Sequence, residues 1–230
     1  VTTDWLAQHL TDSDIRVFDC TTHLIHQSSP ESDAPYIVQS GKDDYDKAHI
    51  PGAAFIDLQQ DLSDTTSPYR FTCLQANQLA EKFGALGIGD NTTAVLYSQT
   101  TPQWATRIWW LLRTVGFDRA CVLDGGLTRW QRDGRAVSSE TTTHPPALLT
   151  TQPRNGLLVD KATVLSAIDD DSTCTINALR AVQHAGLDNG EFGHYGRPGR
   201  IPRSVNVATN ELVNPKTMEF LPSEEIRSRL

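Results

Sequence analysis

Cysteine is the residue type in this sequence best suited to nucleophilic chemistry. The four cysteines are Cys20, Cys73, Cys121 and Cys174. They are widely separated and include no Cys-x-x-Cys pair, and no Cys/His cluster has the spacing of metal ligands, so we expect no metal site. Cys20 ends a predicted strand, where parallel sheets place their sites, and is the best placed of the four for reaction. We still expect it to pack in the core, because a partly buried free thiol is usually inert.

A basic cluster is the second feature that suits chemistry. Its members are Arg180, Arg197, Arg200 and Arg203, in a chain whose formal net charge is −8. The planar fork of a guanidinium matches the oxygens of small anions. His194 lies in the same loop and is a candidate to assist there. The alternative is a solvated basic loop, because exposed charges are commonly just solvated.

Composition excludes several classes of partner. Hydrophobic residues make up 38% and charged residues 21% of the 230 residues, which is ordinary for a soluble globular protein. The negative net charge, without a Lys/Arg-rich run, argues against nucleic acid and acidic membrane surfaces as partners. No stretch approaches the roughly 18 apolar residues of a membrane helix, and no signal peptide is visible. We therefore expect a cytoplasmic protein with reduced thiols.

Strands and helices alternate along the first 137 residues. Strands are predicted at 16–20, 54–56, 93–97 and 120–123, and helices at 3–10, 75–86, 102–115 and through Trp130 to near Gly134. Such alternation is typical of an α/β fold with a mainly parallel sheet and helices on both faces. The polar residues 26–44 are predicted as a loop. Residues 138–156, rich in Thr, Pro and Ser, are predicted as a linker between domains.

The first pattern begins again after the linker. A predicted helix at 159–168, a strand at 174–178 and a second strand at 204–206 follow the order of the first copy, with Asn177 at the place of Asp19. The helix after Leu221 matches the one after Leu74. Ser98 lies 24 residues after Leu74, so the matching position falls near residue 245, which is 15 residues past Leu230. We expect the second copy to be incomplete at Leu230, without its own version of the loop that holds Ser98.

Three motifs resemble those of the rhodanese family in its tandem, two-domain form. They are Ala48-His49-Ile50-Pro51-Gly52-Ala53, Trp104-Ala105-Thr106-Arg107-Ile108-Trp109-Trp110 and Val122-Leu123-Asp124-Gly125-Gly126-Leu127-Thr128-Arg129-Trp130. The resemblance implies a first rhodanese-like domain at 1–137, the linker at 138–156 and a partial second domain at 157–230. It also implies a thiosulfate or 3-mercaptopyruvate sulfurtransferase. A cysteine persulfide would pass sulfur from a small anionic donor to a thiol or cyanide, without a cofactor.

The resemblance assigns roles to particular residues. Ser98 takes the first-domain position of the family's cysteine; since a serine cannot hold a persulfide, we expect the first domain to be inactive and Ser98 to cap the following helix. Arg180, Arg197 and Arg200 would bind the donor, although Asn177-Ala178-Leu179 stands where many members have Asp-x-Arg, which leaves the choice of donor open. The nucleophile is expected downstream of Leu230, so these 230 residues are predicted to be inactive alone. The alternative is a non-catalytic rhodanese-like module for binding or regulation.

Two motif residues are expected to have structural roles. His49 should anchor the His-Ile-Pro-Gly-Ala turn by a side-chain hydrogen bond, and Asp124 should belong to a turn before a helix. A related cysteine-dependent phosphatase is not expected, because no cysteine has an arginine six positions later.

Overall fold

The computed structural model describes residues 1–27, 29, 34–188, 190–192 and 197–230. The chain divides into two compact units, which we describe separately. The first unit comprises Val1–His23, Val38–Asn155 and Thr217–Glu219, and the second comprises Leu24–Ile37, Gly156–Lys216 and Phe220–Leu230. No helix in the described part of the chain combines the length and apolar character needed to cross a membrane.

A parallel four-stranded sheet forms the centre of the first unit. Its strands are β1 (Ile15–Asp19), β4 (Ala54–Phe55), β5 (Thr93–Tyr97) and β6 (Ala120–Val122), in the order β4-β1-β5-β6. Residues of β1 alternate between the two faces. Ile15 and Val17 join one core cluster, with Leu6 of α1 and Trp130 of α6, whereas Phe18 is buried outside that cluster. Burial on both faces explains why the strands are almost continuously apolar, as the sequence predicts.

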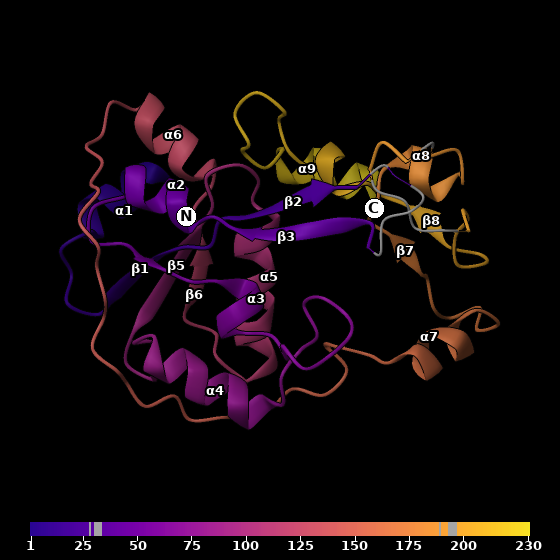
Figure 1. Cartoon of the computed structure of the whole chain (residues 1–230), viewed down its shortest axis with the longest axis horizontal. Coiled ribbons are helices and arrows are strands. Elements are labelled where there is room, and N and C mark those ends of the chain that lie inside the picture. Colours follow the sequence, from indigo (N-terminus) through magenta and orange to yellow (C-terminus); the bar gives the residue numbers. More distant parts are fainter. Residues whose placement is uncertain (28, 30–33, 189, 193–196) are drawn as a thin grey trace. The chain divides into compact units, whose positions relative to one another are not determined.

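Helices cover this sheet. They are α1 (Thr3–His9), α2 (Lys42–Lys47), α3 (Leu58–Asp61), α4 (Ala76–Ala85), α5 (Gln103–Thr114) and α6 (Gly126–Arg132). α5 packs along β5 and β6, and α1 contacts α6 (Figure 1). α1 begins where it does because the Thr2 side chain accepts a hydrogen bond from the Trp5 amide. The predicted helices and strands of this unit are confirmed to within a few residues at their ends.

The prediction of a loop over residues 26–44 is wrong at residues 26, 36–40 and 42–44, which belong to strands and a helix. Strands β2 (Thr22–His26) and β3 (Tyr36–Ser40) pair with each other, and α2 begins at Lys42. The short run Tyr36-Ile37-Val38 has strand-forming side chains, but the Ser, Asp and Pro residues around it dominate the local composition. Residues 28 and 30–33 of the predicted loop lie outside the described part.

The segment after α6 is extended and hydrogen bonded to the first unit. His49 and Ser138 exchange backbone hydrogen bonds of 2.9 Å, and the Ala147 amide donates to Gly84 O at 2.9 Å. A Cβ on Gly84 would lie 2.6 Å from Ala147 O, so the glycine permits this close approach. Residues 138–155 therefore pack along the first unit.

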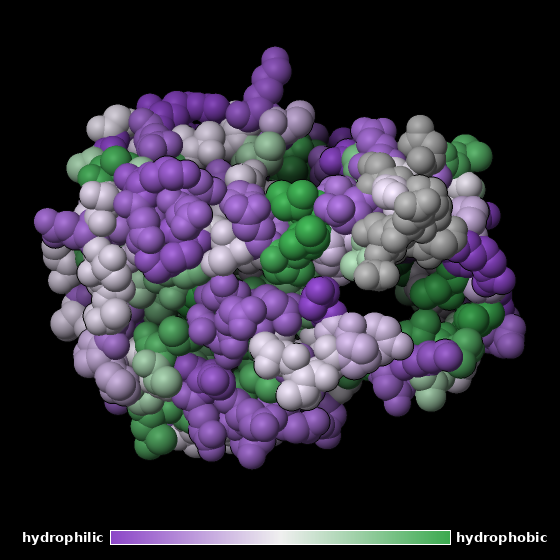
Figure 2. All heavy atoms as spheres, in the orientation of Figure 1, coloured by the Kyte–Doolittle hydropathy of each residue, from purple (hydrophilic) through white to green (hydrophobic). Residues whose placement is uncertain are grey.

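The described residues of the second unit form fewer regular elements than those of the first. They are α7 (Lys161–Ala167), β7 (Ile176–Asn177), α8 (Ala181–His184), β8 (Val205–Asn206), the 3-10 turn η1 (Thr209–Glu211) and α9 (Ser223–Arg229). None of its three α-helices has a fully buried residue among those described. Several large hydrophobic side chains are exposed, among them Leu165, Leu187 and Val205. Figure 2 shows hydrophobic side chains gathered in small groups on a largely hydrophilic surface.

The strand pairing of the first unit occurs again in the second. β1 and β4 are parallel, with Asp19 opposite Phe55, and β7 and β8 are parallel, with Asn177 opposite Asn206. In each pair the backbone amide just after the second strand donates to the last residue of the first strand. Ile56 N donates to Asp19 O at 2.9 Å, and Val207 N donates to Asn177 O at 3.0 Å. The register therefore places Asn177 where Asp19 stands, as the internal repeat in the sequence predicts.

Candidate functional site

The order of the strands locates the place where an α/β sheet binds its ligands. The chain leaves β1 toward β4 on one side and leaves β5 toward β6 on the other. The two connections therefore diverge at the carboxyl ends of β1 and β5, and such a switch point is where open parallel sheets form their sites. Residues 19–21 follow β1 there, and residues 98–101 follow β5.

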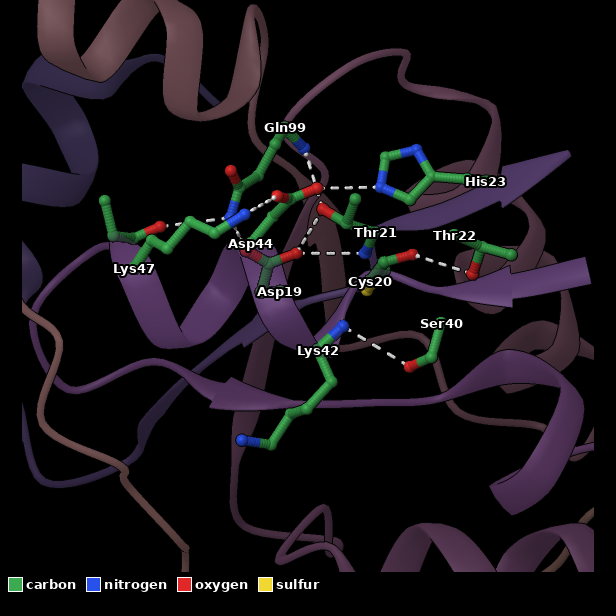
Figure 3. Close-up of polar contacts among 11 residues, drawn as sticks. Asp19, Cys20, Thr21, Thr22, His23, Ser40, Lys42, Asp44, Lys47 and Gln99 are labelled. Carbon is green, nitrogen blue, oxygen red and sulfur yellow. Dashed lines mark hydrogen bonds and ion pairs between the residues drawn. The ribbon is translucent and has the colours of Figure 1, made fainter. Parts of the chain in front are cut away.

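A buried carboxylate occupies this switch point. Asp19 is 0% exposed. Its Oδ1 accepts hydrogen bonds from the Thr21 amide at 2.9 Å and the Thr21 hydroxyl at 2.5 Å, and its Oδ2 accepts one from Gln99 Nε2 at 2.9 Å. The Gln99 amide in turn donates to Thr21 Oγ1 at 2.9 Å, and Gln99 Nε2 also donates to Ala48 O at 3.0 Å. Figure 3 shows Gln99 reaching from its loop toward Asp19 and Thr21.

Electrostatics at this cluster follow from its burial. Burial raises the pKa of Asp19, and the hydrogen bonds from Thr21 and Gln99 oppose that rise by stabilising the carboxylate. The neighbouring Asp44 carboxylate is more exposed. It lies 3.0 Å from Lys47 Nζ and 2.8 Å from His23 Nε2, and the hydrogen bonds from Lys47 and His23 lower its pKa. The Asp19 carboxylate accepts hydrogen bonds at both oxygens and is shielded from solvent, so it holds the 98–101 loop in place and is not available to a substrate.

Ser98 lies in that loop without the predicted capping role. Its hydroxyl donates to the carbonyl of Thr101, and α5 has Pro102 as its N-cap, with no side-chain capping bond. The prediction of a cap is wrong because a capping side chain must adjoin the first helical residue, whereas Ser98 lies four residues before Pro102. Ser98 lines a small hollow together with Pro102, Gly126 and Met218. The loop therefore closes on itself and presents no nucleophile.

Two of the four cysteines, Cys20 and Cys73, are unsuited to sulfur transfer. Cys20 is fully buried, and burial together with the charge of Asp19 raises the pKa of its thiol well above the ordinary value. Cys73 is half-buried, and burial raises its pKa as well. A nucleophilic thiol needs a lowered pKa, so neither resembles an activated cysteine. The expected packing role of Cys20 is confirmed by its burial.

The basic cluster lies in the second unit. Arg180 directly precedes α8, and Arg200 Nη1 donates to the carbonyl of His184 at the other end of that helix, at 3.3 Å. A four-residue helix is about 6 Å long, so the Arg180 backbone and the carbonyl that Arg200 binds lie at the two ends of a short segment. Arg197 is exposed. Arg203 donates to Ile168 O at 3.0 Å and is paired with Asp171, so it has a structural role. His194 lies outside the described residues.

His49 anchors its turn as predicted. Its Nδ1 lies 2.6 Å from Tyr45 O and its Nε2 3.1 Å from Glu140 O, and its ring stacks on that of Tyr45. The Tyr45 hydroxyl donates to Ala53 O at 2.8 Å, which fixes the other end of the His-Ile-Pro-Gly-Ala segment. This turn brings Ala48 O to Gln99, so the motif supports the loop at the switch point.

Sequence reasoning missed the part that Gln99, Thr21 and Asp19 play together. A signal was present, since polar residues follow two apolar strands that become neighbours at the sheet's carboxyl edge. The second unit keeps a trace of the same arrangement. Asn177 Oδ1 accepts from the Leu179 amide at 2.9 Å, as Asp19 Oδ1 accepts from Thr21.

Fold and site together define an α/β protein whose first sheet carries a closed, thiol-free loop at its switch point. The family model described as "Rhodanese-like domain" matches residues 2–133. The chain is 31% identical to the 3-mercaptopyruvate sulfurtransferase of Escherichia coli over 211 residues, which are 91% of this chain and 71% of that protein. It is 27% identical to the mouse (Mus musculus) 3-mercaptopyruvate sulfurtransferase over 230 residues, which cover 97% and 73% of the two chains.

A solved structure agrees with these relatives. The crystal structure of SseA from Escherichia coli, described as having the rhodanese fold of 3-mercaptopyruvate sulfotransferases, superposes with a TM-score of 0.79 at 29% identity. The superposition covers 100% of this chain and 81% of the SseA chain. The chain belongs to the rhodanese family, in the tandem sulfurtransferase branch, as the motifs of the sequence predict.

Proposed function

We propose that this protein is a sulfurtransferase that moves a sulfane sulfur from thiosulfate or 3-mercaptopyruvate to a thiol or cyanide. The observation that carries the proposal is the similarity to 3-mercaptopyruvate sulfurtransferases along nearly the whole chain. The partners we propose are thus small anions and a soluble acceptor. The division into domains at 1–137 and 157–230, with 138–156 as a linker, and the cytoplasm as location stay predictions.

The proposed reaction has two steps. A cysteine thiolate attacks the outer sulfur of the donor and forms an S–S bond; the donor's own bond to that sulfur breaks and releases sulfite from thiosulfate. With 3-mercaptopyruvate the C–S bond breaks, the thiol proton moves to carbon, and pyruvate leaves. The acceptor then removes the outer sulfur from the persulfide and restores the thiolate, which predicts ping-pong kinetics.

The first unit would be silent in this scheme. Its loop carries Ser98 in place of a thiol, and burial raises the pKa of its Cys20 thiol well above the ordinary value. The second unit would supply the donor site through Arg180, Arg197 and Arg200, whose forks suit carboxylate or sulfonate oxygens. The reacting cysteine, predicted near residue 245, stays a prediction.

The polypeptide expressed from its natural reading frame, through whatever follows Leu230, tests the proposal. With either donor and cyanide it is expected to form thiocyanate, whereas the 230 residues alone are expected to form none, because the nucleophilic cysteine is predicted near residue 245. Thiocyanate release is measured against a no-enzyme blank. An absence of product with both donors would reject sulfur transfer and favour the non-catalytic binding module.

A further inference from the structure

We propose that Arg180 is a donor-binding residue held in position by an aromatic clamp, formed by Phe192 and completed by His26. The inference rests on the proposed function, because it concerns the site where the anionic donor would bind. Phe192 and His26 are positioning residues in this account, and the planar edge of Arg180 is the part that meets the oxyanion.

The clamp is defined by ring contacts within the second unit. The guanidinium carbon of Arg180 lies 4.5 Å from the centroid of the Phe192 ring. The His26 ring meets the Phe192 ring edge to face, with centroids 6.2 Å apart at 88°. Tyr36 supports His26 in the same manner, at 6.5 Å and 76°. Both distances are within the range of favourable aromatic pairs, so the three rings form a continuous platform under the cation.

Stacking holds Arg180 by its face and leaves its edge open. The five N–H donors of a guanidinium lie in its plane, so a ring against the face blocks none of them. Among the described residues, no acceptor is hydrogen bonded to the Arg180 guanidinium, and the residue is exposed. By contrast, the guanidinium of Arg200 is bonded to His184 O and that of Arg203 to Ile168 O and Asp171.

Preorganisation is the benefit of such a clamp. A free arginine side chain samples many rotamers and must lose that freedom when it binds an anion. A guanidinium already fixed on a ring loses less, so its bidentate bond to a carboxylate or sulfonate is tighter. The proposed ligand is therefore a small oxyanion, which is a feature that thiosulfate and 3-mercaptopyruvate share.

The clamp joins parts of the chain far apart in sequence. His26 and Tyr36 belong to β2 and β3, in the segment Leu24–Ile37 that groups with the second unit. Arg180 follows β7, more than a hundred positions later. No motif or spacing in the sequence links these residues, so the clamp is visible in the fold alone.

Binding of thiosulfate and of 3-mercaptopyruvate to the 230-residue chain, measured separately by calorimetric titration, tests the clamp. Phe192→Leu is expected to weaken binding about two- to five-fold, the range of an exposed cation–π contact. Phe192→Tyr keeps the aromatic face and should restore the affinity of the original chain. Arg180→Gln should lose binding further, and Arg203→Gln, outside the clamp, should leave the affinity unchanged.

The outcomes separate the clamp from the proposed function. Equal affinities for Phe192→Leu and the original chain, or no binding of either anion to the original chain, would overturn the clamp. Thiocyanate formation by the natural-frame polypeptide decides sulfur transfer independently. Binding that depends on Phe192, without any sulfur transfer, would retain the clamp and reject the sulfurtransferase.

Discussion

Gly126→Ala is expected to lower the free energy of unfolding of the first unit by about 2–5 kcal/mol. A Cβ at this position would lie 2.2 Å from the carbonyl oxygen of Ser98, and the backbone has φ of 51°. The oxygen belongs to the main chain of the loop at the switch point, so relief of the clash requires the loop to move. The left-handed backbone adds a cost for any residue with a Cβ.

Gly134→Ala is the matched control for this prediction. Gly134 also has positive φ, at 72°, but a Cβ added there would meet nothing within 4 Å. It should cost about 1–2 kcal/mol, from the backbone alone. All five tryptophans lie in the first unit, so tryptophan fluorescence during urea unfolding reports on that unit. Equal losses for the two variants would show that the loop does not press against Gly126.

Asp19→Ala is expected to cost about 2–4 kcal/mol, because it leaves buried donors without an acceptor. The Thr21 amide loses its partner, and Gln99 Nε2 keeps only Ala48 O among its described acceptors. Asp19→Asn should cost about 1 kcal/mol or less, since its amide oxygen still accepts from Thr21. Asn177 already makes that bond in the second unit. Urea unfolding of both variants, followed by tryptophan fluorescence, measures the difference.

Comparison of the original chain with Asp19→Asn also predicts a dependence of stability on pH. The pKa of Asp19 is raised in the folded protein above its ordinary value of 3.8, so the folded state holds the proton more tightly than the unfolded state. Stability from this group is therefore fully present below pH 3.8 and is lost as the pH rises through the folded pKa. As the pH rises from 3.8 through the folded pKa of Asp19, the original chain should lose stability relative to Asp19→Asn. A constant difference between the two would contradict the burial of the carboxylate.

Much of the first unit could be predicted from periodicity. Apolar runs such as Thr93–Tyr97 indicate strands, and glycines such as Gly116 indicate helix ends. Both are local signals, which is the kind of information that sequence patterns contain. β2 and β3 were missed because their strand-forming residues are few and lie among turn-forming ones. Their pairing depends on partners distant in sequence, which no local window includes.

The site could be predicted only in outline. The motifs gave the position of the loop after β5 and the anchoring role of His49, both of which are local features. The closure of that loop by Asp19 depends on β1 and β5 becoming neighbours, and the platform under Arg180 depends on the segment Leu24–Ile37 grouping with the second unit. Contacts between distant segments are a property of the tertiary fold, so they required the structure.

Mapping of the persulfide by peptide mass spectrometry tests the central claim most directly. The polypeptide from the natural reading frame is treated with thiosulfate or 3-mercaptopyruvate, digested without reductant, and searched for a cysteine that carries one additional sulfur atom. We predict the sulfur on a cysteine beyond Leu230, with Cys20, Cys73, Cys121 and Cys174 unmodified. A persulfide on any of these four cysteines, or on no cysteine at all, would contradict the account.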